Sequence, residues 1–267
     1  MNTLLRLSIA VGALVLAPTM PLTAAQTPED KGLWIAEEAD KRDLGWNDSE
    51  VKLNMILRNS HGDSSVRDLR IRSLEVPDRK IGDKSVTIFD KPRDIKGTAF
   101  LSHTKIFDPD DQWLYLPALK RVKRISSANK SGPFVGSEFA YEDLVSQEVE
   151  RYGYKWLRDE ACGDLECYVV ERTPVYEHSG YTKQIVWMDK TDFQARKLEF
   201  YDRKDSLLKT LMLTDYRRYL DTYWRAHTLE MTNHQTGKST TLTFSDYRFQ
   251  VGLAEKNFRK NRLKRAK

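Results

Sequence analysis

Two hydrophobic periods divide the sequence beyond residue 25. Over residues 28–42 the apolar side chains recur with the 3.6-residue spacing of one helix face. Residues 27–30 (Thr-Pro-Glu-Asp) begin this stretch with a capping hydroxyl, a proline at the first helical position and two acids in the first turn. The pattern therefore predicts one amphipathic helix, which ends before Gly45.

From about Val51 the period changes to two residues, which is the spacing of a half-buried strand. The alternating segments are 51–57, 69–71, 74–76, 86–88, 112–116, 183–189, 195–201, 207–213, 227–231 and 239–247. Turn-forming residues separate them at 61–63, 77–78, 108–110, 202–205 and 235–238. About ten strands joined by short loops predict an antiparallel meander with one packed face. A sheet this large must curl or close, so we expect it to wrap on the single helix.

One region interrupts the alternation. Residues 116–125 contain four basic residues within five positions, a loop of small residues follows, and residues 134–144 bring aromatics that look exposed. A plain hairpin with a long loop explains this region, and so does a cationic, aromatic-flanked segment at a cavity mouth or partner surface. Under the second interpretation the candidate ligand or partner contacts are Trp113, Tyr115, Lys120, Arg121, Lys123, Arg124, Phe139 and Tyr141.

The first 25 residues have the layout of a secretory signal peptide. Arg6 provides a positive charge, residues 7–17 form an apolar run, and small residues precede an expected cleavage near Ala25. The apolar run is eleven residues long, well short of the roughly 20 that span a bilayer. A retained anchor is the alternative. We expect cleavage, and hence an exported, periplasmic chain.

The charge of the chain is uneven. The formal net charge is +5, yet residues 256–267 hold seven basic residues and no acidic one. Residues 26–255 are slightly acidic, with 36 basic against 39 acidic residues, which argues against a nucleic-acid partner. The basic C-terminal tail, 256–267, has two interpretations. It is either a frayed, solvated end or a contact with anionic lipid headgroups.

Cys162 and Cys167 are the two cysteines, separated by Gly-Asp-Leu-Glu. In an exported chain a close pair predicts a disulfide, and the Gly-Asp between them suits a tight turn. The flanking Trp156 and residues 168–170 suit strands, so we expect a stapled hairpin. A metal site needs more ligands than two thiols, and a redox pair more usually has the Cys-x-x-Cys spacing.

Sequence motifs for catalysis are lacking. The five histidines lie in unrelated settings, and no zinc-protease, nucleophile-elbow, P-loop or dinucleotide-binding motif occurs. Residues 127–130 match Ser-x-x-Lys without its companion motifs, and residues 108–111 lack the glycine and glutamate of a calcium loop. We expect no catalytic residue, no metal and no cofactor.

Three blocks of sequence resemble a known family: residues 32–46, 113–125 and 136–144. On these residues the chain resembles the exported outer membrane lipoprotein-sorting proteins, which are similar to the LolA and LolB carriers. The resemblance covers nearly all of the mature chain, so residues 26–255 are expected to form one domain. It implies a mainly β fold, a curved antiparallel half-barrel, with an N-terminal helix and lid elements over an apolar concave face.

The resemblance implies binding of lipid or lipoprotein acyl chains, transient membrane contact and an RND-type inner-membrane transporter as partner. A lipid-sensing adaptor that regulates a transporter or signalling protein is the alternative, and a hydrolase hidden in the fold is a third. The chain is longer than LolA, so a dedicated lipoprotein carrier does not follow. Aromatic and methionine side chains that could line the groove, or form ordinary sheet core, are Trp113, Tyr115, Trp187, Met188, Phe200, Met212 and Met231.

Overall fold

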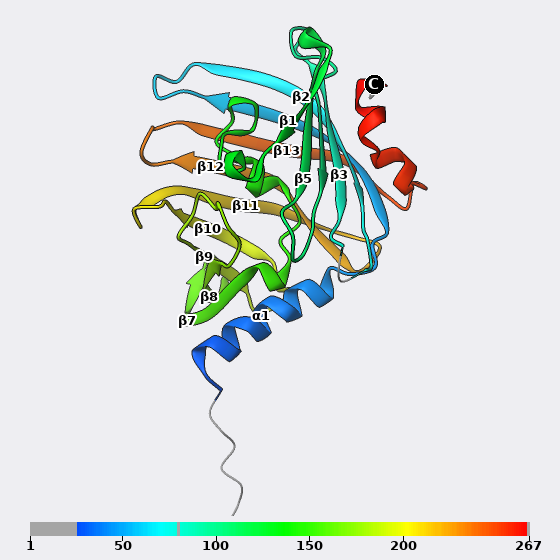
Figure 1. The fold of residues 1–267 in the computed structure, drawn as a ribbon. Helices are drawn as coiled ribbons and strands as arrows, with labels where there is room; N and C mark the ends of the chain where they lie inside the picture. Colours follow the sequence, from blue (N-terminus) through cyan, green and yellow to red (C-terminus); the bar gives the residue numbers. More distant parts are fainter. Residues whose placement is uncertain (1–25, 79–80, 266–267) are drawn as a thin grey trace, which may run out of the picture.

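The computed structural model describes residues 26–78 and 81–265. The signal peptide expected at residues 1–25 lies outside them. Within this range a single open sheet of thirteen strands curves into a half-barrel, and every neighbouring pair is antiparallel (Figure 1). The predicted fold class is confirmed.

Most strands contain a predicted segment, but the separate strand predicted at 74–76 is wrong, because Leu74 is the last residue of the strand that also holds 69–71. The strands are β1 (Asp48–Arg58), β2 (Ser64–Leu74), β3 (Lys84–Lys91), β4 (Ala99–His103), β5 (Asp111–Leu116), β6 (Arg121–Ile125), β7 (Tyr152–Cys162), β8 (Leu165–Pro174), β9 (Lys183–Asp189), β10 (Ala195–Tyr201), β11 (Leu207–Tyr219), β12 (Tyr223–Asn233) and β13 (Ser239–Phe249). The alternation did not predict β4. The basic residues after Leu116 form the second strand of a plain hairpin, β5–β6.

Two meanders meet in the middle of the sheet. The first runs from β1 to the edge strand β6, the second from the opposite edge strand β7 to β13, and β1 pairs with β13. Because β6 and β7 lie at opposite edges, residues 126–151 must cross the whole sheet to connect them. We call this connection the plug. It runs within the hollow of the half-barrel (Figure 1).

The helix α1 (Pro28–Arg42) begins as predicted, with Thr27 and Asp30 forming a capping box. It covers one end of the sheet rather than the whole concave face. Ile35 is buried against Val170 of β8 and Phe193. Gly32 lies so close to β7 that a Cβ there would be 2.8 Å from the backbone nitrogen of Lys155. The expectation of a sheet wrapped on the helix is therefore wrong over most of the sheet, where the plug takes that place.

The sheet carries core on both faces. The concave face holds the main cluster, which includes Leu53, Phe100 and Met231 and continues into the plug. On the convex face of β3 to β5, Val86 and Leu101 pack against the C-terminal segment, residues 255–265. This segment comprises the 3₁₀ helices η6 (Glu255–Phe258) and η7 (Lys260–Arg265).

The C-terminal segment is not a frayed end. Phe258 and Leu263 are 1% and 2% exposed. The ring nitrogen Nε2 of His103 donates to the Phe258 carbonyl at 2.7 Å, and Lys84 forms an ion pair with Glu255. These contacts hold the segment on the convex side of the sheet, drawn in red in Figure 1.

The stapled hairpin is confirmed. Cys162 ends β7, Cys167 lies on β8, and the two form a disulfide with Cα atoms 5.9 Å apart. Gly163, at the turn, has a φ of +69°, a conformation that a glycine adopts without steric cost. Cys167 is fully buried among Val169, Ile185 and Trp187 on the convex face.

Candidate functional site

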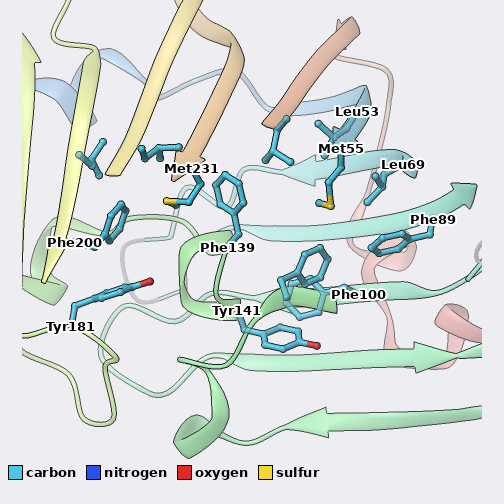
Figure 2. Packing of buried hydrophobic residues seen from close by; sticks show 14 of the residues in the cluster. Leu53, Met55, Leu69, Phe89, Phe100, Phe139, Tyr141, Tyr181, Phe200 and Met231 are labelled. Carbon is cyan, nitrogen blue, oxygen red and sulfur yellow. The ribbon is translucent and has the colours of Figure 1, made fainter. Parts of the chain in front are cut away.

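The plug fills the middle of the concave face with aromatic rings. Phe134 and Phe139 are 1% and 3% exposed, and Tyr141 is 9% exposed. The ring centroids of Phe134 and Tyr141 lie 5.3 and 5.4 Å from that of Phe100 on β4. Phe139 points toward Met231 of β12 (Figure 2). Phe134 and Tyr141 thus pack together on β4, whereas Phe139 packs toward β12, and the interpretation of these aromatics as exposed is wrong.

Side chains from the first meander hold the plug by its backbone. Arg67 of β2 donates from Nη1 to the Val135 carbonyl at 2.6 Å, and Gln112 of β5 donates from Nε2 to the Tyr141 carbonyl at 3.1 Å. Among the described residues of the plug, the one β-bridge is an isolated antiparallel bridge between Pro133 and Ala140, and both of these residues belong to the plug itself. The plug is therefore bound to the sheet through side chains and is not one of its strands.

A buried ion pair holds the plug to the second meander. Nζ of Lys209 on β11 lies 2.7 Å from Oδ2 of Asp143, and both side chains are less than a tenth exposed. The same ammonium donates to the Glu138 carbonyl at 2.9 Å, and the Tyr181 hydroxyl donates to the other Asp143 oxygen at 2.8 Å. Burial, reinforced by Asp143, raises the pKa of Tyr181 well above its usual value. Tyr181 therefore remains a neutral hydrogen-bond donor.

A second polar network fixes both flanks of the plug. Glu142 accepts from the Gly180 backbone nitrogen at 2.8 Å and from the Ser179 hydroxyl at 3.0 Å. Burial and the neighbouring Asp143 raise the pKa of Glu142. Near the end of the plug, Arg151 and Asp110 form an ion pair at 2.7 Å with side chains 4% and 5% exposed. This pair ties the plug to the loop before β5.

A cavity of about 350 Å³ remains between the plug and the central strands. Its size is within the roughly 300–1,000 Å³ of small-molecule pockets. Apolar side chains dominate its walls: Val51, Leu53, Met55, Ile71, Leu229, Leu242 and Phe244 from the sheet, and Phe134, Phe139, Leu144 and Val145 from the plug. We call it the concave cavity. Its walls suit an apolar chain better than a polar solute, because a polar group would lose its water without replacement.

One end of the concave cavity is polar. Asp83 and Ser146 line it, and the Ser146 hydroxyl donates to Asp83 at 3.4 Å. Burial raises the pKa of Asp83 to about 6, and burial together with Asp83 raises the pKa of nearby Glu148 to about 7. Arg225 also lines the cavity and pairs with Asp43 at 2.5 Å. The cavity is thus lined at this end by an acidic side chain, Asp83, and a basic one, Arg225.

A more open cavity of about 590 Å³ lies on the other side of Phe139. It is lined by the plug around Gly136–Ala140, by Leu208 and Lys209 of β11, by Asn233 of β12, and by the loops at 180–181, 202–204 and 236–238. Phe139 lines both cavities, whereas Asp143 lines the first and its partner Lys209 the second. The ion pair and the phenyl ring therefore separate the two spaces.

The structure scatters the predicted contact residues. Arg121 and Lys123 pair with Leu116 and Leu114 on the concave side of the edge strand β6. Arg124 pairs with Trp113 on the convex side and forms an ion pair with Asp111. Lys120 lies in the turn with a φ of 49°. The four basic residues are exposed, but they do not form one surface.

The predicted groove-lining residues divide between the two faces. Phe200, Met188 and Met231 pack with the concave cluster. Trp113 and Tyr115 lie on the convex face under the C-terminal segment, and Trp187 belongs to the convex cluster around Cys167. Met212 pairs with Lys197, which pairs with Trp187, so Met212 is also convex. Of the two alternatives for these four residues, groove lining is therefore wrong, and Trp113, Tyr115 and Trp187 belong to the sheet core instead.

Sequence reasoning missed Lys209, Asp143 and Arg225. The signal for Lys209 was present, because it precedes the inward-facing Leu211 by two residues and so shares its face. A lysine at an inward position needs a buried partner. No local pattern marks Asp143 as buried. Its burial follows from the path of the plug, which is set by the positions of β6 and β7 at opposite edges of the sheet.

Among the described residues, no group of three or more histidine, cysteine, aspartate or glutamate side chains could hold a metal ion. Within residues 26–78 and 81–265, no helix is long and apolar enough to cross a membrane.

The fold and the cavity define a class of protein: an open half-barrel with an apolar pocket on its concave face. A crystal structure of an outer membrane lipoprotein-sorting protein domain from Vibrio parahaemolyticus is 59% identical over 88% of this chain and 99% of that chain, with a TM-score of 0.86. A family model described as "-like: Uncharacterized protein" matches residues 82–265. No curated protein matches. The chain belongs to the outer membrane lipoprotein-sorting protein family.

Two further crystal structures are similar. A DUF1329 family protein from Desulfovibrio piger is 28% identical over 89% of this chain and 99% of that chain, with a TM-score of 0.84. A LolA superfamily protein from Nitrosomonas europaea is 22% identical over 86% of this chain and 98% of that chain, with a TM-score of 0.69. The last similarity shows that the fold is the LolA half-barrel.

Proposed function

We propose that the protein is a periplasmic carrier of lipids or lipidated proteins that holds acyl chains in the concave cavity. The observation that carries this proposal is the apolar cavity of about 350 Å³ between plug and sheet. Membership of the lipoprotein-sorting family supports the same role. The function is binding, not catalysis.

The walls of the cavity match an acyl chain in chemistry. Each buried methylene contributes about 0.8 kcal/mol, so burial of about ten methylenes supplies roughly the 8 kcal/mol of micromolar affinity before the cost of association. Met55 and the plug rings Phe134 and Phe139 line the site. Methionine adapts to chains of different shape, because its side chain is unbranched and flexible.

The plug also offers a route for release. It is bound by side chains such as Arg67 and Lys209 rather than by a strand ladder, so it can shift without breaking the sheet. Displacing Phe139 and the Lys209–Asp143 pair would join the two cavities into one longer groove. A carrier requires such an opening, since cargo must enter and leave.

The proposed partners are the acyl chains themselves, a membrane surface touched transiently and an RND-type inner-membrane transporter. The alternative function is a lipid-sensing adaptor that regulates a transporter or a signalling protein. Transfer of a labelled lipid between two vesicle populations by the purified protein supports the carrier. A stable membrane partner whose affinity changes with lipid, without transfer between vesicles, supports the adaptor.

Native mass spectrometry of protein purified gently from periplasm tests the proposal directly. We expect a stoichiometric lipid or acylated species, which organic extraction then identifies. In the delipidated protein, Leu229→Arg should weaken binding of a fluorescent fatty acid by roughly tenfold or more, because it places a charge in the cavity wall. The matched control is Met212→Arg, at an exposed convex position one strand away. Equal binding by both variants would contradict the assignment of the cavity.

A further inference from the structure

The convex face carries a second cavity, of about 220 Å³, under the C-terminal segment. Its apolar lining is Val86, Ile88, Leu101 and Leu263, and its polar lining is Arg72, Asn257, Arg259, Arg262 and Arg265. We call it the arginine cavity. Four of its nine lining residues are arginines and none is acidic, so the cavity is cationic.

The arginines are held in place by the anchoring of the segment. Phe258 and Leu263 are buried against β3 and β4, and His103 donates to the Phe258 carbonyl at 2.7 Å. Arg259 and Arg262 flank these buried residues in sequence and are exposed. The positive charge is therefore carried by an ordered segment, beside the apolar side chains of β3 and β4.

Nearby carboxylates leave most of this charge uncompensated. Among the described residues, the side chains of Arg259, Arg262 and Arg265 form no hydrogen bond or ion pair. Lys84 and, at longer range, Arg259 lower the pKa of Glu255, which is the nearest carboxylate of the segment. Glu255, at the start of the segment, is bonded to Lys84. The cavity's fourth arginine, Arg72, shares the carboxylate of Glu50 with Arg248, at 3.0 and 2.7 Å. A net positive charge remains, which favours an anionic ligand.

We propose that the arginine cavity binds the anionic headgroup of a phospholipid in a membrane surface. Guanidinium groups bind phosphate with paired hydrogen bonds, and Val86, Ile88 and Leu101 offer an apolar floor to the carbon atoms next to the phosphate. The volume of about 220 Å³ is below the range of pockets that enclose whole ligands. The occupant is therefore a headgroup whose acyl chains stay in the bilayer.

This site is independent of the proposed cargo site. Val86 and Thr87 are neighbours on β3, yet Val86 lines the arginine cavity and Thr87 lines the concave cavity. One layer of sheet separates the two. The protein can thus contact a membrane through its convex face whether or not an acyl chain occupies the concave cavity, and the two proposals can fail separately.

Vesicle co-sedimentation of the mature protein tests the proposal. We expect binding to phosphatidylcholine vesicles that contain phosphatidylglycerol, none to pure phosphatidylcholine, and loss of binding at high salt. The triple variant Arg259→Glu, Arg262→Glu, Arg265→Glu should bind roughly tenfold or more weakly. The matched control Arg93→Glu, Lys96→Glu, Arg218→Glu has the same net charge, changes exposed residues that line neither cavity, and should retain binding. Equal loss in both variants would overturn the proposal, because it would show attraction by overall charge alone.

A second variant distinguishes binding by the ordered cavity from binding by a flexible basic peptide. Phe258→Ala keeps every arginine but loosens the segment, so vesicle binding should weaken severalfold. Leu263→Ala repeats this test at the other anchor, and circular dichroism confirms that the sheet is intact. Unchanged binding in both would overturn the role of the ordered cavity. Tight binding of inorganic phosphate by a protein that binds no vesicles would assign the site to a soluble anion instead.

Discussion

The concave and convex faces of one sheet solve the same packing problem with different chemistry. On the concave face the plug is tied down by buried polar groups, among them Lys209 and Asp143, and leaves an apolar cavity. On the convex face the C-terminal segment is tied down mainly by Phe258 and Leu263 and leaves a cationic cavity. Phe134 and Phe139 pack the plug much as Phe258 and Leu263 pack the segment, so the two covers differ mainly in the buried ion pair. Lys209 and Asp143 can exchange each other for water when the plug moves. Under the two proposals, cargo belongs to the concave face and membrane attachment to the convex face.

The largest expected effect comes from breaking the buried ion pair of the plug. Lys209→Met leaves Asp143 charged and buried, so it should lower the free energy of unfolding by about 3–5 kcal/mol, measured by urea denaturation. Lys84→Met is the matched control. It removes a lysine whose partner Glu255 is 71% exposed, and should cost about 1 kcal/mol or less. Similar losses in the two variants would refute the contrast between the covers.

A double-mutant cycle sharpens this result. Adding Asp143→Asn to Lys209→Met removes the unpaired charge, so the double variant should be more stable than the sum of the single effects predicts. The difference should be about 1 kcal/mol or more. Strictly additive losses would show that the two side chains do not act as a pair.

Removing an anchor of the convex cover comes next. Phe258→Ala should lower the free energy of unfolding by about 3 kcal/mol, since it leaves a cavity where a fully buried ring packed. Limited proteolysis should then cut within residues 255–265, while fatty-acid binding in the concave cavity stays unchanged. Resistance of the segment to protease in this variant would mean that Phe258 does not anchor it.

The pH dependence of stability tests the polar end of the concave cavity. The pKa values of Asp83 and Glu148 are raised to about 6 and about 7, so the folded state holds their protons better than the unfolded state. Their favourable contribution is full below about pH 4 and is lost as the pH rises through 6 and 7. Each proton contributes at most about 1.4 kcal/mol per pH unit, and less here because both groups retain some solvent contact. The double variant Asp83→Asn, Glu148→Gln should flatten the wild-type slope between about pH 4 and 7, and an unchanged slope would contradict the assignment.

The disulfide should have a smaller effect. Cys162→Ser with Cys167→Ser opens a short loop, for which the chain-entropy estimate is about 2 kcal/mol in the free energy of unfolding. Thermal unfolding of the wild type with and without a reductant offers the same comparison without mutation. Loss of binding at either cavity would be unexpected, because the hairpin touches neither.

Reversing the charges of the edge strand should have the smallest effect on stability. Arg121→Glu with Lys123→Glu changes the concave side of β6, and Lys120→Glu with Arg124→Glu changes the turn and the convex side. The first variant should alter the free energy of unfolding by about 0.5 kcal/mol or less, because its side chains are exposed. The second should cost up to about 1 kcal/mol, because Arg124→Glu also breaks the ion pair with Asp111. Basic residues on an edge strand also discourage pairing with other chains. Weaker cargo binding at low salt in the first variant alone would assign the predicted headgroup or partner contact to the concave side.

Most of the fold could be predicted because apolar and polar residues alternate in every strand that has one face exposed to solvent. Alternation failed as a signal at β4, where Ala99, Phe100, Leu101 and Ser102 are all buried. The plug covers one face of this strand and the C-terminal segment the other, so Ala99, Phe100 and Leu101 form an uninterrupted apolar run with no alternation. The face assignments failed for a related reason. Trp113 and Trp187 are large and apolar, yet they serve the convex clusters, and alternation alone cannot say which face is concave.

The candidate site was predictable only in part. The importance of residues 134–144 could be recognised from their composition, but their burial follows from a long-range fact, the position of β6 and β7 at opposite edges of the sheet. The pairing of Lys209 with Asp143 depends on that same crossing. Local sequence cannot supply contacts that the topology creates.

The central claim is that acyl chains occupy the concave cavity under the plug. Photo-crosslinking of the delipidated protein with a diazirine-labelled fatty acid, followed by peptide mass spectrometry, tests it most directly. The account predicts crosslinks to peptides that contain Leu229, Leu242 and the plug residues around Phe139, and their loss in Leu229→Arg but not in Met212→Arg. Crosslinks confined to convex peptides such as those with Trp113 or Trp187, or spread evenly over the surface, would contradict it.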